Sequence, residues 1–192
     1  MIPRPLGIAV AVMLVTVFSM GIYVGRMRRQ VADLPIDTRP VAPPPSGPTE
    51  TVTLYVADDA LGAVRPRPAT IPLPGGRQQR AEELLRALLA IYQQRNSPHP
   101  LSAAADIRSF YLVDPGAAVI DLNAAFADQH PSGIQQEQLT VNSLVQTLAV
   151  NVPGINRVRI LVEGKTRETL AGHADLTEFF DVSAVNQAVS GQ

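Results

Sequence analysis

Residues 138–165, QLTVNSLVQTLAVNVPGINRVRILVEGK, decide the fold, because they join a helical pattern directly to a strand pattern. In the first part, apolar side chains recur at helical spacing up to Pro153 and Gly154, which end the helix. In the second part, apolar side chains alternate with others, as in a strand that buries one face. We therefore predict a helix over Ile134–Asn151 and a strand over Asn156–Glu163. The side chains expected in the core are Val141, Leu144, Val145, Leu148, Val152, Val158, Ile160 and Val162.

The residues before this stretch show the same two patterns. Alternation over Thr51–Ala57 predicts a first strand. The prolines of Thr70–Pro74 confine any strand there to a short edge piece beside it. Leucines at helical spacing predict a helix from Arg77 to about Gln94. An Asp-Pro-Gly turn between Ile107–Val113 and Ala118–Leu122 predicts a hairpin.

The order strand, helix, strand, strand, helix, strand predicts an α+β domain. Because each strand is amphipathic, we expect a small mixed or antiparallel sheet with two helices on one face. The other face should meet water or a partner. We assign residues 50–180 to this domain and residues 181–192 to a C-terminal tail.

An uncharged apolar run from Leu6 to Val24 precedes the domain. At about 1.5 Å of rise per residue, it is just long enough to cross a hydrocarbon core of about 30 Å. A cleaved signal peptide is the alternative, although it usually has a shorter apolar region and a clearer cleavage site. We therefore predict a short tail at 1–5, a transmembrane signal-anchor helix at 6–25, and a basic, then proline-rich linker at 26–49.

The charges around the apolar run leave the topology of the membrane helix open. Arg26, Arg28 and Arg29 follow the run, whereas Arg4 precedes it. The positive-inside rule taken alone would therefore place the domain in the cytoplasm. The very short segment before the helix argues for the opposite orientation.

The overall composition excludes several classes of protein. Lys and Arg number 16 against 17 Asp and Glu, without a basic stripe, so we do not expect nucleic-acid binding. The chain has no cysteine, which excludes disulfides, thiolate metal sites and a lipidated N-terminal cysteine. We predict no cofactor and no small-molecule ligand.

Three groups of residues could be read as catalytic or metal-binding. His173 and Asp175 lie two apart, as an acid–base pair or a metal site would require, but the sequence offers no third ligand or nucleophile. We expect Gly172 to turn the chain there and Asp175 to accept backbone N–H bonds.

The other two groups are weaker. His130 could form a hydrolytic triad with Ser132 or Asp128, but the loop lacks a nucleophile elbow. The adjacent Asp58 and Asp59 lack calcium-loop spacing, and we interpret them as a solvated strand end. We therefore assign no catalytic, cofactor or metal residue.

The side chains on the open sheet face are of a different kind. Alternation sends Tyr55 outward from the first strand and Arg157, Arg159 and Leu161 outward from the last. Aromatic and arginine side chains are enriched at the energetic centres of protein interfaces. These four residues are our candidate protein interface.

Several segments taken in order resemble the GerMN domain family. They are TVTLYVADDA, TIPLPGG followed by RAEELLRALL, VDPGAAVIDLNAAF, the stretch quoted first, and ETLAGHADL. The resemblance covers about Thr51 to Phe180. It implies an extracytoplasmic domain with a fold similar to the ring-building motifs of secretion machines, a role in assembling envelope complexes, and no enzymatic activity. Sporulation members of the family carry tandem domains and a lipoprotein cysteine, so a role in sporulation is not carried over.

Together these observations predict a single-pass protein of the bacterial inner membrane whose domain lies outside the cytoplasm. The domain would bind envelope proteins or further copies of itself. A periplasmic hydrolase or metal-dependent enzyme is the first alternative. A small-ligand sensor, which would need a deep apolar pocket, is the second.

Overall fold

The computed structural model describes residue 20 and residues 47–113 and 115–191. The predicted membrane helix at 6–25 and most of the predicted linker at 26–49 lie outside these ranges. Over the ranges described, no helix is long and apolar enough to cross a membrane.

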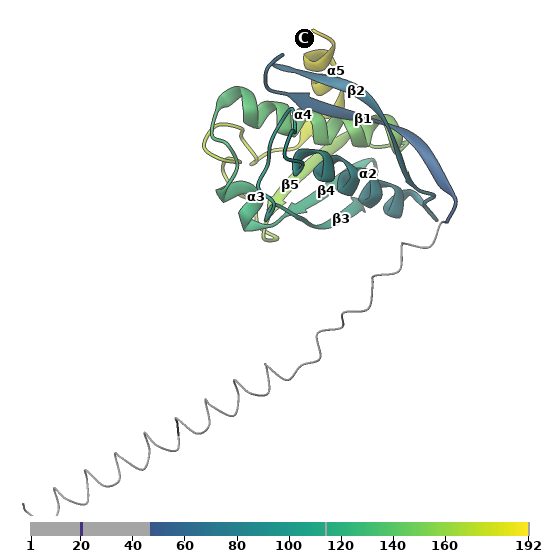
Figure 1. The fold of residues 1–192 in the computed structure, drawn as a ribbon, viewed down its shortest axis with the longest axis horizontal. Helices are drawn as coiled ribbons and strands as arrows, with labels where there is room; N and C mark the ends of the chain where they lie inside the picture. The colour runs from purple at the N-terminus through teal and green to yellow at the C-terminus, as the bar shows by residue number, and fades with distance from the viewer. Residues whose placement is uncertain (1–19, 21–46, 114, 192) are drawn as a thin grey trace, which may run out of the picture. The chain divides into compact units, whose positions relative to one another are not determined.

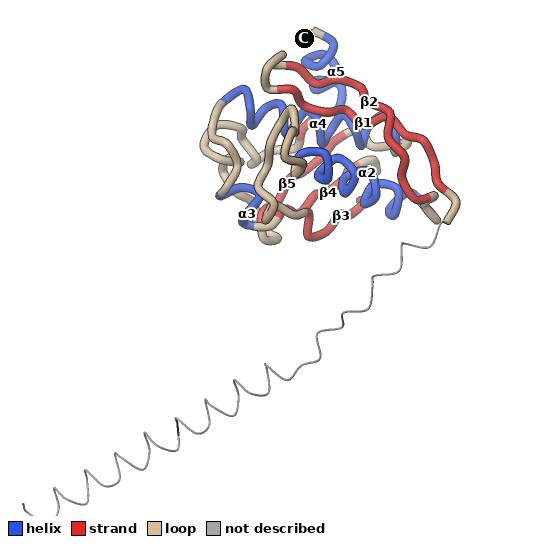
Figure 2. The backbone as a smooth tube through the Cα atoms, viewed as in Figure 1, coloured by secondary structure: helices blue, strands red, loops and turns tan. Residues whose placement is uncertain are grey.

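Two small sheets and four helices make up residues 47–191 (Figures 1 and 2). The strands are β1 (Thr49–Asp58), β2 (Ala63–Pro72), β3 (Ile107–Val113), β4 (Ala117–Leu122), β5 (Arg157–Val162) and β6 (Phe180–Asp181). The helices are α2 (Arg77–Tyr92), α3 (Ala124–Asp128), α4 (Ile134–Asn151) and α5 (Val182–Ser190).

The first predicted strand does not join the main sheet. β1 pairs only with β2, antiparallel over its whole length from Asp58 opposite Ala63 to Thr49 opposite Pro72. The short edge piece predicted at Thr70–Pro74 is therefore only the end of a much longer strand. The prediction missed most of β2 because Pro66 and Pro68 argue against a strand.

The prolines of β2 are compatible with a strand because of its register. Pro66 lies opposite Tyr55 and Pro68 opposite Thr53. The N–H groups of Thr53 and Tyr55 point away from β2, so these pairs exchange no ladder hydrogen bond and need no proline N–H. The outer edge of β2 accordingly lacks donors at both prolines.

Side chains from two helices cover the other edge of β1. The hydroxyl of Thr147 accepts the N–H of Tyr55 at 2.9 Å, and the amide of Asn151 bonds both backbone groups of Thr53. The hydroxyl of Tyr92 accepts the N–H of Ala57 at 2.9 Å, and burial raises the pKa of Tyr92 to about 12. β1 is thereby attached to α4 and α2 without a further strand.

The main sheet has the order β3-β4-β5-β6 within the described residues. β3 and β4 form the predicted hairpin, and β4 and β5 run parallel. The expected core residues of the last strand, Val158, Ile160 and Val162, are all buried. The expectation of a small mixed sheet with helices is confirmed at this level, although β1 does not belong to it.

α4 lies at the centre of the fold and packs against β1, α2 and α5 (Figure 1). We predicted one buried stripe, but every residue from Leu139 to Leu148 is buried. The single-stripe prediction is wrong because the β1–β2 ribbon covers the side of α4 that would otherwise meet water. Polar residues of α4 are consequently buried, among them Glu137, Thr140 and Thr147.

The chain does not end in the expected tail. Phe180–Asp181 pairs with β5, and Asp181 begins α5 by accepting the N–H of Ser183 at 2.8 Å. Val185 is buried where α5 packs on α4. The sequence analysis missed this helix, which is only nine residues long, although five of the nine are valine or alanine.

Candidate functional site

The open face of the main sheet carries two rows of side chains that run across three strands. Register places Tyr111 of β3 beside Val119 of β4 and Arg159 of β5. In the next row, Val113 and Arg157 lie on either side of the small Ala117. Helices cover the opposite face, so these rows are what the sheet presents outward.

Phe179 extends this face beyond β5. The guanidinium carbons of Arg157 and Arg159 lie 4.9 and 5.3 Å from the centre of its ring. Both distances are within the range of cation–π attraction, which holds the ring and the two arginines together. The sequence analysis did not include Phe179, because it precedes a strand of only two residues.

The open face exposes several large apolar side chains. The exposed fractions are 55% for Tyr111, 48% for Val113 and 41% for Phe179, while Leu161 is half-buried. Large apolar side chains beside arginine are the composition found at protein-binding surfaces. We call Tyr111, Val113, Arg157, Arg159, Leu161 and Phe179 the open-face patch.

Tyr55 does not belong to this patch. It lies on β1, in the other sheet, and is half-buried against the core. The prediction that Tyr55 shares one face with Arg157, Arg159 and Leu161 is wrong, because β1 pairs with β2 and not with β5. The interface role of the three β5 residues stays a prediction.

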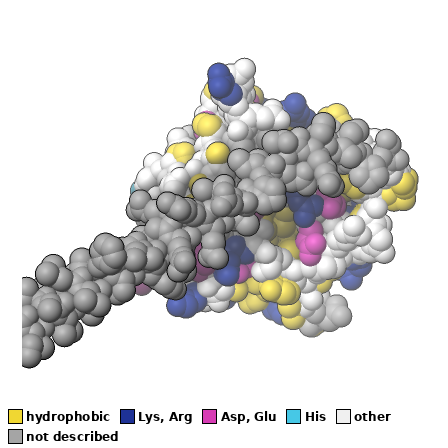
Figure 3. Space-filling view, turned by 60° about the horizontal axis from the view of Figure 1, so that its bottom comes forward, with side chains coloured by type: hydrophobic (Ala, Val, Ile, Leu, Met, Phe, Trp, Pro, Cys, Tyr) yellow, Lys and Arg dark blue, Asp and Glu magenta, His cyan; other side chains and the backbone are white. Residues whose placement is uncertain are grey.

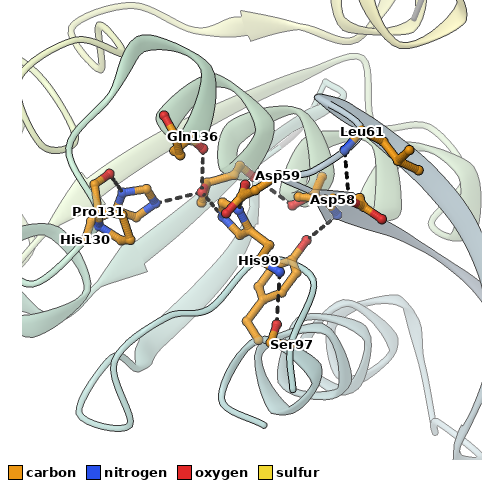
Figure 4. Close-up of polar contacts among 12 residues, drawn as sticks. Asp58, Asp59, Leu61, Ser97, His99, His130, Pro131 and Gln136 are labelled. Atoms are coloured by element: carbon orange, nitrogen blue, oxygen red, sulfur yellow. Dashed lines mark hydrogen bonds and ion pairs between the residues drawn. The ribbon is translucent and has the colours of Figure 1, made fainter. Parts of the chain in front are cut away.

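A buried polar chain connects the turn after β1 to α4 (Figure 4). Asp59 Oδ1 lies 2.6 Å from His99 Nδ1, and His99 Nε2 lies 2.6 Å from the hydroxyl of Thr140. On the other side of that hydroxyl, His130 Nε2 lies at 2.7 Å. His130 Nδ1 contacts the carbonyl of Pro131 at 2.7 Å.

The hydroxyl of Thr140 lies at the centre of this chain, because it contacts both imidazole rings. The carbonyl of Pro131 only accepts, so His130 Nδ1 carries a proton. Burial, the largest influence, lowers the pKa of His130. The hydroxyl of Thr140 also lies 3.1 Å from the carbonyl of Gln136, to which it can donate.

The carboxylate, imidazole and hydroxyl of this chain follow the order of a hydrolytic triad. However, His99 and Thr140 both have an exposed fraction of 0%, so a substrate cannot reach them. His130 contacts neither Ser132 nor Asp128, the partners considered from sequence. His99 and Thr140 were missed, since only the tertiary fold brings them together.

Glu137 organises the loop that contains His173. Its buried carboxylate accepts the N–H groups of Ala171, His173 and Ala174, each at 2.9 Å, and contacts His173 Nδ1 at 2.9 Å. Burial alone would raise the pKa of Glu137, but these hydrogen bonds outweigh it and lower the pKa to about 2. His173 is therefore part of a loop anchor, a contact that the sequence analysis missed.

Asp175 does not accompany His173 in this contact. Its carboxylate accepts the N–H and the hydroxyl of Thr177, both at 2.7 Å, and these bonds lower its pKa. Gly172 turns the chain with a φ of 122°. Throughout the described residues, no three His, Asp or Glu side chains are placed to hold a metal ion together.

Comparison with known proteins gives the family. Residues 53–168, more than half of the chain, match the model of the family Germane, which is described as sporulation and spore germination. The chain belongs to the Germane family. The resemblance to GerMN domains is thereby confirmed. The Germane match ends before β6 and α5, which complete the fold here.

Solved structures similar to this Germane protein include the tandem GerMN domains of the sporulation protein GerM from Bacillus subtilis. That pair is 18% identical over 70% of this chain, with a TM-score of 0.51, and the match spans 46% of the tandem chain. The first GerMN domain alone is 18% identical, with 67% and 94% of the two chains covered and a TM-score of 0.48. A candidate lipoprotein from Clostridium perfringens is 23% identical, with 74% and 93% covered and a TM-score of 0.46. A comparison with curated proteins gave no match.

Proposed function

We propose that this Germane protein is a membrane-anchored envelope protein whose domain binds other proteins through the open-face patch. The observation that carries the proposal is the row of Tyr111, Val119 and Arg159 across three strands, extended by Phe179. The partners are envelope proteins or further copies of the chain.

The proposed location rests on the sequence. The uncharged run from Leu6 to Val24 is long enough to cross a bilayer, and the proline-rich residues after it suit a spacer. In this arrangement the domain lies outside the cytoplasm. An anchor of this kind concentrates domains near one another, so that weak contacts suffice for assembly.

A role in binding fits the polar groups of the described domain better than catalysis does. His99 and Thr140 are sealed from solvent, and the carboxylate of Glu137 is engaged by backbone N–H groups. A hydrolase needs its nucleophile at a surface that substrate can reach.

The test is a double variant, Arg159→Glu with Leu161→Asp, in the full-length chain. A photo-crosslinking residue in place of Tyr111 should give adducts in the native cells, and the double variant should lose them. Leu61→Asp is the matched control, because Leu61 is 62% exposed and lies in the turn between β1 and β2, outside the patch. Adducts that persist in a correctly folded double variant would place the interface elsewhere and refute the proposal.

A further inference from the structure

The edge of β3 is protected differently from the other strand edges of the described fold. Prolines remove donors from the edge of β2, and helix side chains bond the edge of β1. β6 has only two residues. β3 has a bulge near Arg108, and beyond it the regular edge runs to Val113. An edge of this kind can accept a further strand.

One side chain occupies this edge. The carboxamide of Gln78 on α2 donates to the carbonyl of Phe110 and accepts the N–H of Leu112 at 3.3 Å. These are the two backbone groups that one residue of a neighbouring parallel strand would bond. Gln78 is itself exposed, so an incoming backbone can displace it without opening the core.

A groove runs along the edge between β3 and α2. Its deeper part has a volume of about 320 Å³ and is lined by Gln78, Glu82, Arg86 and Leu89 on one side and by residues 106–111 on the other. It continues past the loop at residues 103–105 to Gln93. From Gln78 to Gln93, α2 advances about 22 Å at 1.5 Å per residue. That length suits an extended segment of about six or seven residues.

The shape of the groove favours a single strand. α2 forms the wall opposite β3, so the second strand of another sheet would collide with the helix. The edge of a second copy of this domain therefore does not fit, whereas a tail or an extended loop does. Figure 3 shows acidic, basic and apolar side chains together on the side of the molecule that includes the lower part of Figure 1, where β3 lies.

The charged residues that line the groove indicate which side chains a bound peptide should carry. Arg86 and Arg108 are each paired with an acid that does not line the groove. Glu82 and Asp106 contact no cation among the described residues. The side-chain partner of Glu82 is Gln78, whose amide donates to it at 2.7 Å. Displacing Gln78 therefore removes the hydrogen-bond donor of Glu82. A basic side chain of the peptide can take its place.

We propose that the groove between α2 and β3 binds an extended peptide segment of a partner protein, which displaces Gln78, pairs with the backbone at Phe110 and Leu112, and places a lysine or arginine beside Glu82. This is binding by strand addition. The inference does not rest on the proposed function, because the groove follows the edge of β3 and the open-face patch lies on the face of the sheet. Tyr111 is the residue that the two surfaces share.

Three fluorescent peptides test the proposal by anisotropy against the full-length chain. The first is Thr-Lys-Val-Lys-Val-Lys-Thr, the second has glutamate in place of each lysine, and the third is the first with alternate amide nitrogens methylated. We expect only the first to bind. Hydrogen–deuterium exchange should then slow in residues 107–113 and not elsewhere on the sheet.

Two variants give opposite expected effects. Gln78→Ala removes the competing side chain and should tighten binding about fivefold, the factor for one net hydrogen bond. Glu82→Gln keeps the shape but removes the charge and should weaken binding about fivefold or more. Gln94→Ala is the matched control, because Gln94 is exposed and does not line the groove. It should leave binding unchanged.

Several results would overturn the proposal. They are failure of the basic peptide to bind Gln78→Ala, equal binding of the acidic or methylated peptide, and protection of strands of the main sheet other than β3. A dimer of the chain that Gln78→Ala strengthens would show that a second copy fills the groove. The variant with Arg159→Glu and Leu161→Asp should bind the peptide normally. Loss of binding there would place the peptide on the open-face patch, which refutes this inference and leaves the proposed function standing.

Discussion

Glu137 is the residue on which the C-terminal loop depends. Glu137→Gln should weaken the hydrogen bonds to the carboxylate and destabilise the chain by about 3 kcal/mol at pH 7, the order expected from a carboxyl pKa near 2. Denaturant unfolding of the full-length chain measures this. Glu178→Gln, at an exposed position, is the control and should change stability little.

The same contact gives a pH dependence with a definite sign. The pKa of Glu137 is lower in the folded chain, about 2, than its ordinary value of 4.5. Its contribution is therefore complete above pH 4.5 and is lost as the pH falls from there towards 2. The Gln variant should lack this part of the acid sensitivity. An unchanged acid profile would show that the carboxylate is not charged in the fold.

His130 should make the chain sensitive to milder acid. Burial first, then the nearby His99, lowers its pKa, whereas the carbonyl of Pro131 and the charges of Glu137 and Asp59 oppose that shift. Because the folded pKa lies below 6.5, stability should fall as the pH drops below about 6.5 and level off below the folded pKa. His130→Gln should reduce the change in the free energy of unfolding between pH 7 and pH 5. A slope equal to that of the unaltered chain would contradict this account.

Some residue roles could be predicted and others could not. The turn at Gly172 and the bonds that Asp175 accepts follow from local sequence. The chain through His99 and Thr140 does not, because it joins residues 40 and 41 positions apart in the sequence. Nothing in the sequence around Glu137 shows that its carboxylate is enclosed by a loop more than thirty residues later.

At the scale of elements, the prolines of β2 keep its outer edge from pairing with other chains. Replacing Pro66 and Pro68 together by threonine restores two outward N–H donors on an exposed strand. We expect the variant to remain folded and to self-associate more as concentration rises, which light scattering measures. Pro100→Thr, at an exposed position of a loop, is the control. Identical scattering by both variants would show that the prolines do not protect the edge.

Periodicity predicted elements well where one face is buried and the other is wet. The strand alternation of β5 and the helical spacing of α2 are of this kind, and their predicted bounds are close to those observed. Periodicity failed for β2, where prolines at outward positions hide a strand. For α4 it predicted the observed bounds, Ile134–Asn151, but not the burial of every residue from Leu139 to Leu148. Periodicity could not show which sheet β1 joins, because side chains of α4 and α2 bond the edge of β1 where a third strand would otherwise pair.

For the whole molecule, the orientation across the membrane decides which partners are possible. We expect a reporter fused after Gln192 to be active outside the cytoplasm. The basic residues at 26–29 favour the opposite result, so the outcome is informative in either case. A phosphatase that is active only after export reports a C-terminus outside the cytoplasm. A fluorescent protein that matures only in the cytoplasm reports the opposite orientation. Fluorescence without phosphatase activity would overturn the proposed envelope role.

The attachment of β1 to α4 has a consequence for the order of events during translation. Thr53 is made early, but Asn151, which bonds its backbone, follows 98 residues later. At about 5–20 residues per second, the ribosome needs about 5–20 s to supply that partner. Throughout this interval the first hairpin has one unsealed edge in the nascent chain. We therefore expect this edge to be open to chaperones that bind extended segments, well before the mature domain meets any partner.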